Sequence, residues 1–99
     1  MKKGGCVYIT ANKNNTTLYV GVTSDLAGRI HDHKNHKYPK SFTARYNVTK
    51  LVYYEGYHSI VEAIAREKQL KAGSRLKKES LINDMNPEWR DLYEEVLKW

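Results

Sequence analysis

The sequence predicts a single α/β domain of the α+β type, with strands and helices in the order β-β-α-β-α-α-α. Two short alternating apolar segments flank a turn-rich run, which is the pattern of a β-hairpin. A later β-branched and aromatic run ends at Gly56, as a third strand would. The remaining segments carry helical periodicity and capping residues. Ninety-nine residues suffice for one modest core, so we expect one domain over residues 1–99.

The predicted hairpin pairs residues 7–9 with residues 18–20 around the turn-rich run at residues 12–15. Because side chains alternate along a strand, Tyr8 and Tyr19 fall on one face and the aliphatic residues on the other. A symmetric hairpin would place the two tyrosines nearly opposite each other.

Thr23, Ser24 and Asp25 are candidates for the N-cap of a first helix. This helix is predicted from Asp25 to about Asn35, with a buried stripe formed by Leu26 and Ile30. Arg29 and His33 are four residues apart, so they lie one above the other on a helix. At ~100° per residue, both fall close to the buried stripe. We therefore expect them to face the sheet or its rim, on the side of the two tyrosines.

Basic and aromatic residues alternate from Lys34 to Tyr46, where Pro39 argues against a continuous helix. Basic side chains can neutralise phosphates and aromatic rings can stack on bases, and loops often carry such contacts. The same run is compatible with a solvated loop pinned by Phe42 and Tyr46. The candidate contacts to nucleic acid are Lys34, Lys37, Lys40 and Arg45.

A third strand is expected over residues 51–55, followed by the most clearly marked helix of the chain. Ser59 and Glu62 form a capping box, and Gly73 is placed as a C-terminal stop. These signals predict a helix from Ile60 to Ala72.

Glu67 falls inside the apolar stripe of that helix. Burying an unpaired charge costs several kcal/mol, so Glu67 needs a cation beside it. Two partners are open at this point: a metal ion, or a structural salt bridge to Arg29 or Lys71.

After Gly73, Ser74 can cap a short basic helix that ends near Asp84. Asn86, followed by Pro87 and an acid, predicts the start of a last helix. Its role as a cap is a sufficient explanation for Asn86. The apolar face of this last helix, expected in the core, consists of Trp89, Leu92, Tyr93 and Val96.

The formal net charge of +6 favours an acidic partner, most simply nucleic acid. Cys6 is the one cysteine, so no internal disulfide is possible, and no apolar run has the length of a signal peptide core or a membrane span. We expect a cytoplasmic protein that does not enter a membrane. The histidines near His33 do not form a zinc site, because residues two apart on a helix point to different sides.

Taken together, these residues resemble the GIY-YIG nuclease superfamily, and in particular its small stand-alone bacterial, excinuclease-like members. The first triplet of the family appears as Cys6-Val7-Tyr8 and the second as Tyr19-Val20-Gly21. The arginine and histidine of the following helix match Arg29 and His33, and the glutamate of the later helix matches Glu67.

Three further positions extend the resemblance or depart from it. Tyr46 matches a tyrosine found before the third strand, and the family asparagine falls at Asn86 or Asn83, of which we prefer Asn86. Cys6 stands where the family has glycine, which bears on how closely backbone and substrate approach there. The catalytic residues implied by the resemblance are Tyr8, Tyr19, Arg29, His33, Tyr46 and Asn86.

The resemblance implies a three-stranded antiparallel sheet flanked by helices, and an endonuclease that hydrolyses phosphodiester bonds in nucleic acid, DNA rather than RNA. One Mg²⁺ or Mn²⁺ ion would be held by Glu67 and complete its shell with water and phosphate oxygens. Arg29 would stabilise the charge that develops on the phosphate. Tyr8 would orient or deprotonate the attacking water, with Arg29 or the metal favouring its phenolate. Tyr19 and His33 would assist, and the roles of these three residues could be exchanged.

A second class of function remains open: a non-catalytic module of the same fold that binds nucleic acid and recruits a partner. Pure binding has no need for a carboxylate such as Glu67 beside a phosphate. A domain that binds only protein is disfavoured by the basic run after Lys34. The family suggests a role in DNA repair, with a partner protein supplying specificity.

Overall fold

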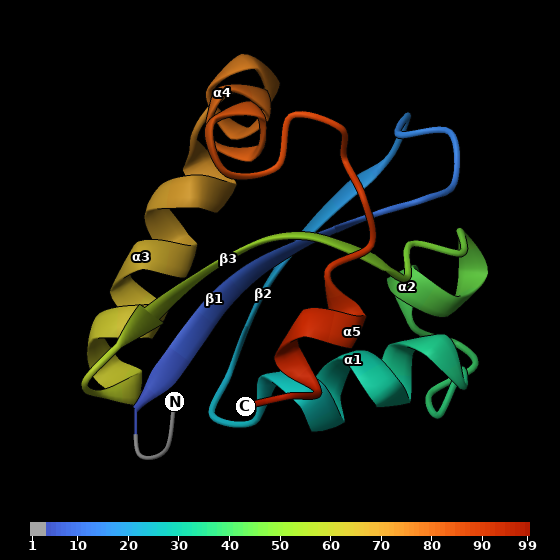
Figure 1. Cartoon of the computed structure of the whole chain (residues 1–99), viewed down its shortest axis with the longest axis horizontal. Coiled ribbons are helices and arrows are strands. Elements are labelled where there is room, and N and C mark those ends of the chain that lie inside the picture. The colour runs from blue at the N-terminus through green and yellow to red at the C-terminus, as the bar shows by residue number, and fades with distance from the viewer. Residues whose placement is uncertain (1–3) are drawn as a thin grey trace.

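The computed structural model describes residues 4–99, so the basic start of the chain lies outside the described residues. Three strands form one antiparallel sheet in the order β2-β1-β3, which confirms the predicted fold class (Figure 1). The central strand β1 (Gly5–Ala11) pairs with β2 (Leu18–Thr23) on one side and with β3 (Lys50–Tyr57) on the other. The third strand thus extends beyond the predicted residues 51–55 at both ends.

Helices cover both faces of the sheet. Under α3 and α4, a core cluster is built on Val7, Ile9 and Val52. Under α1 and α5, a second cluster is built on Tyr8, Ile30 and Leu51. The helices are α1 (Leu26–Lys34), α2 (Phe42–Arg45), α3 (Ile60–Ala72), α4 (Arg75–Met85) and α5 (Tyr93–Val96). None of these helices is long and apolar enough to cross a membrane.

The hairpin register separates the aliphatic and tyrosine faces as predicted, but Tyr8 and Tyr19 are not opposite each other. Tyr8 pairs with Gly21, and Tyr19 pairs with Thr10. The loop extends beyond residue 15 because the Asn12 side-chain oxygen accepts hydrogen bonds from the backbone amides of residues 16 and 17, at 2.8 and 3.0 Å. This longer loop moves the register by two residues relative to the symmetric hairpin.

The predicted caps form at three helix starts. The Asp25 side chain accepts from the backbone amide of Gly28 at 3.1 Å, and Ser59 accepts from that of Glu62 at 3.2 Å. Ser74 caps α4 in the same way, accepting a 3.2 Å bond from residue 77. Each of these bonds satisfies an amide that the first helical turn leaves without a partner. The predicted bounds of α3 are confirmed at both ends.

The basic run after α1 contains a short helix, α2, that the sequence did not predict. Ser41 caps it by accepting from the Ala44 amide at 3.3 Å. Thr43 anchors the run, being only 2% exposed, whereas Phe42 and Tyr46 are 45% and 51% exposed. The loop is therefore anchored in the interior by the side chain of Thr43, whereas its two aromatic rings remain partly exposed.

The prediction of a last helix beginning at Asn86 is wrong. Asn86 instead forms the C-cap of α4, and its side chain binds the backbone at Val52 and Arg90. The chain then runs without helix until α5. As a result, the expected apolar face divides, with Trp89 packed on the cluster under α4 and Leu92 buried in the cluster under α1.

Candidate active site

Tyr8 lies at the centre of the sheet with no exposed surface, and its hydroxyl oxygen is 2.8 Å from His33 Nε2. The ring crosses over the facing residue of β2, Gly21. A Cβ atom at Gly21 would lie 2.3 Å from the Tyr8 hydroxyl oxygen, which is far inside contact distance. Glycine at this position therefore lets the tyrosine reach α1 across the sheet.

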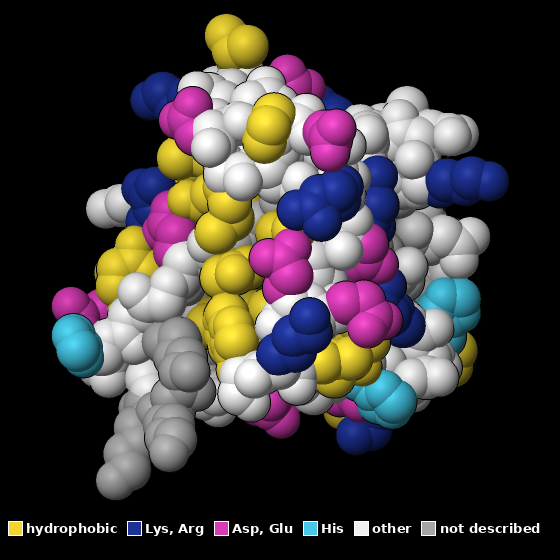
Figure 2. Space-filling view, in the orientation of Figure 1, with side chains coloured by type: hydrophobic (Ala, Val, Ile, Leu, Met, Phe, Trp, Pro, Cys, Tyr) yellow, Lys and Arg dark blue, Asp and Glu magenta, His cyan; other side chains and the backbone are white. Residues whose placement is uncertain are grey.

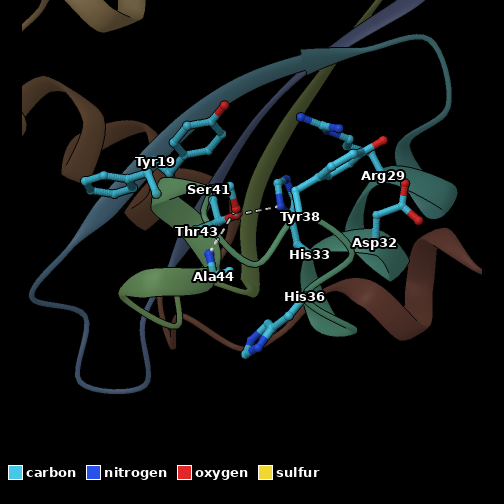
Figure 3. A pocket seen from close by; sticks show the side chains of 10 residues that line it. Tyr19, Arg29, Asp32, His33, His36, Tyr38, Ser41, Thr43 and Ala44 are labelled. Carbon is cyan, nitrogen blue, oxygen red and sulfur yellow. Dashed lines mark hydrogen bonds between the residues drawn. The ribbon is translucent and has the colours of Figure 1, made fainter.

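A cavity of about 130 Å³ opens between α1 and α2, beside β2 (Figure 3). Tyr8 is not among the residues that line it, because its hydroxyl lies behind the wall, bonded to His33. The side chains that line the cavity include those of Tyr19, Arg29, His33, Tyr38, Phe42 and Thr43. Three of the predicted site residues, Tyr19, Arg29 and His33, thus share one cavity.

A buried hydrogen-bond chain joins three elements behind this cavity. Tyr8 on β1 bonds His33 Nε2. His33 Nδ1 lies 2.9 Å from the Thr43 hydroxyl on α2, a contact drawn in Figure 3. His33 is only 7% exposed. The chain therefore fixes the imidazole ring at both nitrogens.

Burial controls the protonation of Tyr8. Burial raises the pKa of Tyr8 to about 12, although a hydrogen bond from Arg29 acts in the opposite direction. The same hydrogen bond raises the pKa of Arg29. Arg29 thus acts in the direction that favours the Tyr8 phenolate, but in the free protein burial outweighs it and Tyr8 is neutral.

Burial and the nearby charge of Arg29 lower the pKa of His33 to about 4. The unfolded side chain titrates near 6.5, so the unfolded chain binds more protons between about pH 6.5 and 4. We expect the free energy of unfolding to fall as the pH is lowered through this interval, by on the order of 3 kcal/mol from this residue. Urea unfolding of the wild type and of His33→Gln across the interval measures the difference. Parallel losses of stability in the two proteins would contradict the assignment.

Glu67 on α3 is not among the residues that line the cavity, and Lys71 lies between its carboxylate and the ring of Tyr19. The carboxylate is 3.3 Å from Lys71 Nζ, which in turn lies 5.8 Å from the centre of the Tyr19 ring. The Glu67 side chain is 16% exposed and that of Lys71 is 50% exposed. The salt bridge considered from the sequence is thus present with Lys71, at a site that solvent reaches.

The donor set restricts which metal this site could hold. Within residues 4–99, no group of three or more His, Cys, Asp or Glu side chains could ligate a metal ion together. A lone carboxylate suits Mg²⁺ or Mn²⁺, which keep water and phosphate oxygens as their other ligands. It does not suit a structural zinc ion, which needs four protein ligands. Glu67 therefore fits one hard divalent ion.

Aromatic rings continue from the cavity to its outer edge. Phe42 stacks on Tyr19 at a centroid distance of 6.1 Å, and Tyr46 packs against Phe42 at 4.8 Å. The guanidinium of Arg45 lies 5.7 Å above the Tyr46 ring, and the guanidinium of Arg29 lies 5.9 Å above that of Tyr38. Tyr46 is thus connected to the site through Phe42 and does not line the cavity.

The predicted nucleic-acid contacts divide into two kinds. Lys37, Lys40 and Arg45 are exposed on the segment that borders the cavity. Lys34 is not available in the same way, because its ammonium group is bound to Asp91 and donates to the Thr49 carbonyl at 3.2 Å. Lys34 thus fastens α1 to the C-terminal segment, and it is less available to nucleic acid than predicted. Figure 2 shows basic and acidic side chains interspersed over the face that carries α4 and α5.

The structure does not bring Asn86 to the cavity. Its amide nitrogen donates to the carbonyls of Val52 and Arg90 at 3.2 and 2.8 Å, and its oxygen accepts from the Arg90 amide at 3.1 Å. Val52 belongs to the core under α3 and α4, whereas Tyr8 belongs to the core under α1 and α5. Asn83 binds the Trp89 indole at 2.7 Å. The contacts of both asparagines are structural.

Two residues have a different place in the structure from that suggested by the sequence. Cys6 is buried under α1 and α5 and is not among the residues that line the cavity, so its side chain does not obstruct the approach of a substrate there. Burial also raises the pKa of its thiol. Thr43 was missed from the sequence, and the signal that could have found it is the cap pattern of Ser41 three residues before Ala44.

The fold agrees with the comparison of sequences. A family model described as the GIY-YIG catalytic domain matches residues 4–80. The chain therefore belongs to the GIY-YIG family.

Within that family the chain is similar to proteins named UPF0213. It is 38% identical over 72 residues to one from Syntrophus aciditrophicus, which covers 73% of this chain and 82% of the relative. It is also 38% identical over 78 residues to one from Staphylococcus haemolyticus, covering 79% and 93%. The solution NMR structure of a UPF0213 protein from Bacillus halodurans has a TM-score of 0.55 and 30% identity, covering 88% of this chain and 90% of that one.

Proposed function

We propose that this protein is a divalent-metal-dependent endonuclease that hydrolyses phosphodiester bonds in nucleic acid, DNA rather than RNA. The observation that carries the proposal is the convergence of Arg29, Tyr19 and the Tyr8–His33 pair at one cavity, in a chain with the GIY-YIG family's motifs. A guanidinium held by a buried hydroxyl is prepared to bind an anion in a fixed orientation.

Arg29 has the central part in this proposal. Its planar fork binds two oxygens of the phosphate and stabilises the charge that develops on them. The Tyr8 hydroxyl interacts with Arg29 from behind the cavity wall, and it is hydrogen-bonded to His33 Nε2 at 2.8 Å. Because the pKa of Tyr8 is raised to about 12, its neutral hydroxyl is better suited to orienting Arg29 than to acting as a base in the resting protein.

Tyr19 and Glu67 complete the proposed site. The ring of Tyr19 is half-buried and borders the cavity, where its hydroxyl can hold the attacking water or a phosphate oxygen. Glu67 would hold one Mg²⁺ or Mn²⁺ ion, which supplies charge that neutralises the phosphate and acidifies a bound water. Lys71 shares the Glu67 carboxylate in the free protein and is exposed enough to release it.

The segment between α1 and β3 supports nucleic acid as the substrate. Lys37, Lys40 and Arg45 offer exposed positive charge next to the exposed rings of Phe42 and Tyr46. Phosphate contacts of this kind position a nucleic acid without reading its sequence. We therefore propose weak sequence specificity. From the resemblance to the family we also propose a role in DNA repair, with a partner protein contributing to target choice.

One observation favours a second candidate, a binding module without activity. Lys71 already neutralises Glu67, the candidate metal ligand, and Tyr8 is neutral. A chain of this kind could bind nucleic acid through the same basic segment and recruit a catalytic partner.

Incubation with labelled supercoiled plasmid, single strand, flap, fork and RNA hairpin separates the two candidates. We expect cleavage of at least one DNA substrate with Mg²⁺ or Mn²⁺, and none with a chelator. Salt-sensitive binding to these substrates without cleavage of any of them would favour the binding module instead.

A further inference from the structure

Thr43 occupies a place that neither the family motifs nor the basic character of its loop accounts for. Its side chain is almost fully buried in the first turn of α2. Its hydroxyl oxygen lies 2.9 Å from His33 Nδ1 and 3.2 Å from the Ser41 hydroxyl oxygen. The hydroxyl, seen beside His33 in Figure 3, therefore stands at the end of the hydrogen-bond chain that leads through His33 to Tyr8.

The direction of each bond in this chain follows from what each group can donate. Neutral Tyr8 has one O–H proton and, being buried, needs an acceptor for it. Arg29, whose charge acts on the same hydroxyl, has donors and no acceptor. His33 Nε2, 2.8 Å away, is the acceptor that remains, so Nε2 carries no proton.

A neutral imidazole has one proton, which then lies on Nδ1 of His33. The acceptor for that proton is the Thr43 hydroxyl oxygen at 2.9 Å. The Thr43 hydrogen can in turn be donated to the Ser41 oxygen. Every donor in the chain has an acceptor only in this arrangement.

We infer that Thr43 is a positioning residue that holds His33 in its Nδ1–H tautomer, so that the Tyr8 hydroxyl donates to His33 and presents its lone pairs to Arg29. Without the Thr43 hydroxyl, the buried Nδ1–H group loses its acceptor, so each tautomer leaves one buried donor unsatisfied and the preference for Nδ1–H is lost. Nε2–H would then donate to the Tyr8 oxygen and compete with Arg29 for it. The tautomer rests on the hydrogen-bond geometry and on the neutral states of Tyr8 and His33, whereas its effect on cleavage rests on the function proposed above.

The test compares Thr43→Val, which keeps the shape and removes the hydroxyl, with Thr43→Ser, which keeps the hydroxyl. A matched control is Thr10→Val, because Thr10 is equally buried on the tyrosine face of β1 and its hydroxyl has no hydrogen-bond partner among residues 4–99. The imidazole ¹⁵N chemical shifts of His33 report the tautomer in each folded protein. Single-turnover cleavage with Mg²⁺ reports the consequence.

We expect the Nδ1–H tautomer in the wild type, Thr43→Ser and Thr10→Val. Thr43→Val should populate the Nε2–H tautomer beside the Nδ1–H tautomer and lower cleavage by about 10–100-fold, as loss of an orienting partner commonly does. An Nε2–H wild type, an unchanged tautomer in Thr43→Val, or full cleavage after the tautomer has changed would each overturn the inference. If the wild type cleaves nothing, the proposed function fails, and the tautomer measurement decides the role of Thr43 by itself.

Discussion

Replacing Arg29 by lysine is expected to lower single-turnover cleavage by about 10²–10³-fold, as removal of a donor to a developing anion does in other enzymes. Lysine keeps the positive charge but lacks the planar guanidinium group with its several N–H donors. It therefore cannot interact with Tyr8 and bind two phosphate oxygens at the same time. Binding of nucleic acid should therefore be retained while the rate falls. The rate is measured at saturating protein, where binding does not limit it.

Arg66→Lys is the matched control for Arg29→Lys. Arg66 also uses its fork, bonding both carboxylate oxygens of Glu55 at 2.9 and 3.1 Å, but it lies on α3 and does not line the cavity. This control should lose stability and keep the cleavage rate. An equal loss of cleavage rate in the two variants would mean that the guanidinium group of Arg29 matters only for folding.

Glu67→Gln is expected to abolish metal-dependent cleavage, because a neutral amide is a poor ligand for Mg²⁺. The free energy of unfolding of the metal-free protein should change by less than about 1 kcal/mol, since partly exposed helical ion pairs contribute little. Cleavage is measured over a titration of Mg²⁺, and stability by urea unfolding with a chelator present.

Glu79→Gln provides the comparison for Glu67→Gln. Glu79 pairs with Arg75 four residues before it on α4, at 2.7 Å, so the change removes a similar helical ion pair away from the cavity. We expect full cleavage in this control. A loss of several kcal/mol of stability in Glu67→Gln alone would instead identify Glu67 as half of a structural salt bridge.

Local signals were sufficient to predict most of the fold. The alternation of the hairpin strands placed Tyr8 and Tyr19 on one face, and the caps at Asp25, Ser59 and Ser74 fixed the starts of three helices. These features depend on neighbours in the sequence, so they can be read from it. The helix predicted at Asn86 failed because the residue also has long-range partners, which local signals do not contain.

The candidate site was predictable only in part for the same reason. Helical spacing brought Arg29 and His33 to the sheet, and the apolar stripe of α3 singled out Glu67. The balance of burial against the charge of Arg29 at Tyr8 depends on the whole fold, so the sequence alone does not give the protonation state of Tyr8. Thr43 and the engaged Lys34 were misjudged because their partners, His33 and Asp91, are distant in sequence.

The most direct test of the proposed nuclease site measures binding and cleavage of one labelled DNA substrate in the same samples of wild type, Arg29→Lys and Glu67→Gln. Each protein first binds the DNA in the presence of a chelator, and excess Mg²⁺ then starts the reaction. The account predicts similar dissociation constants for all three proteins and cleavage by the wild type alone, apart from a slow residual rate in Arg29→Lys. Equal cleavage by all three proteins, or a loss of cleavage that follows a loss of binding, would contradict it.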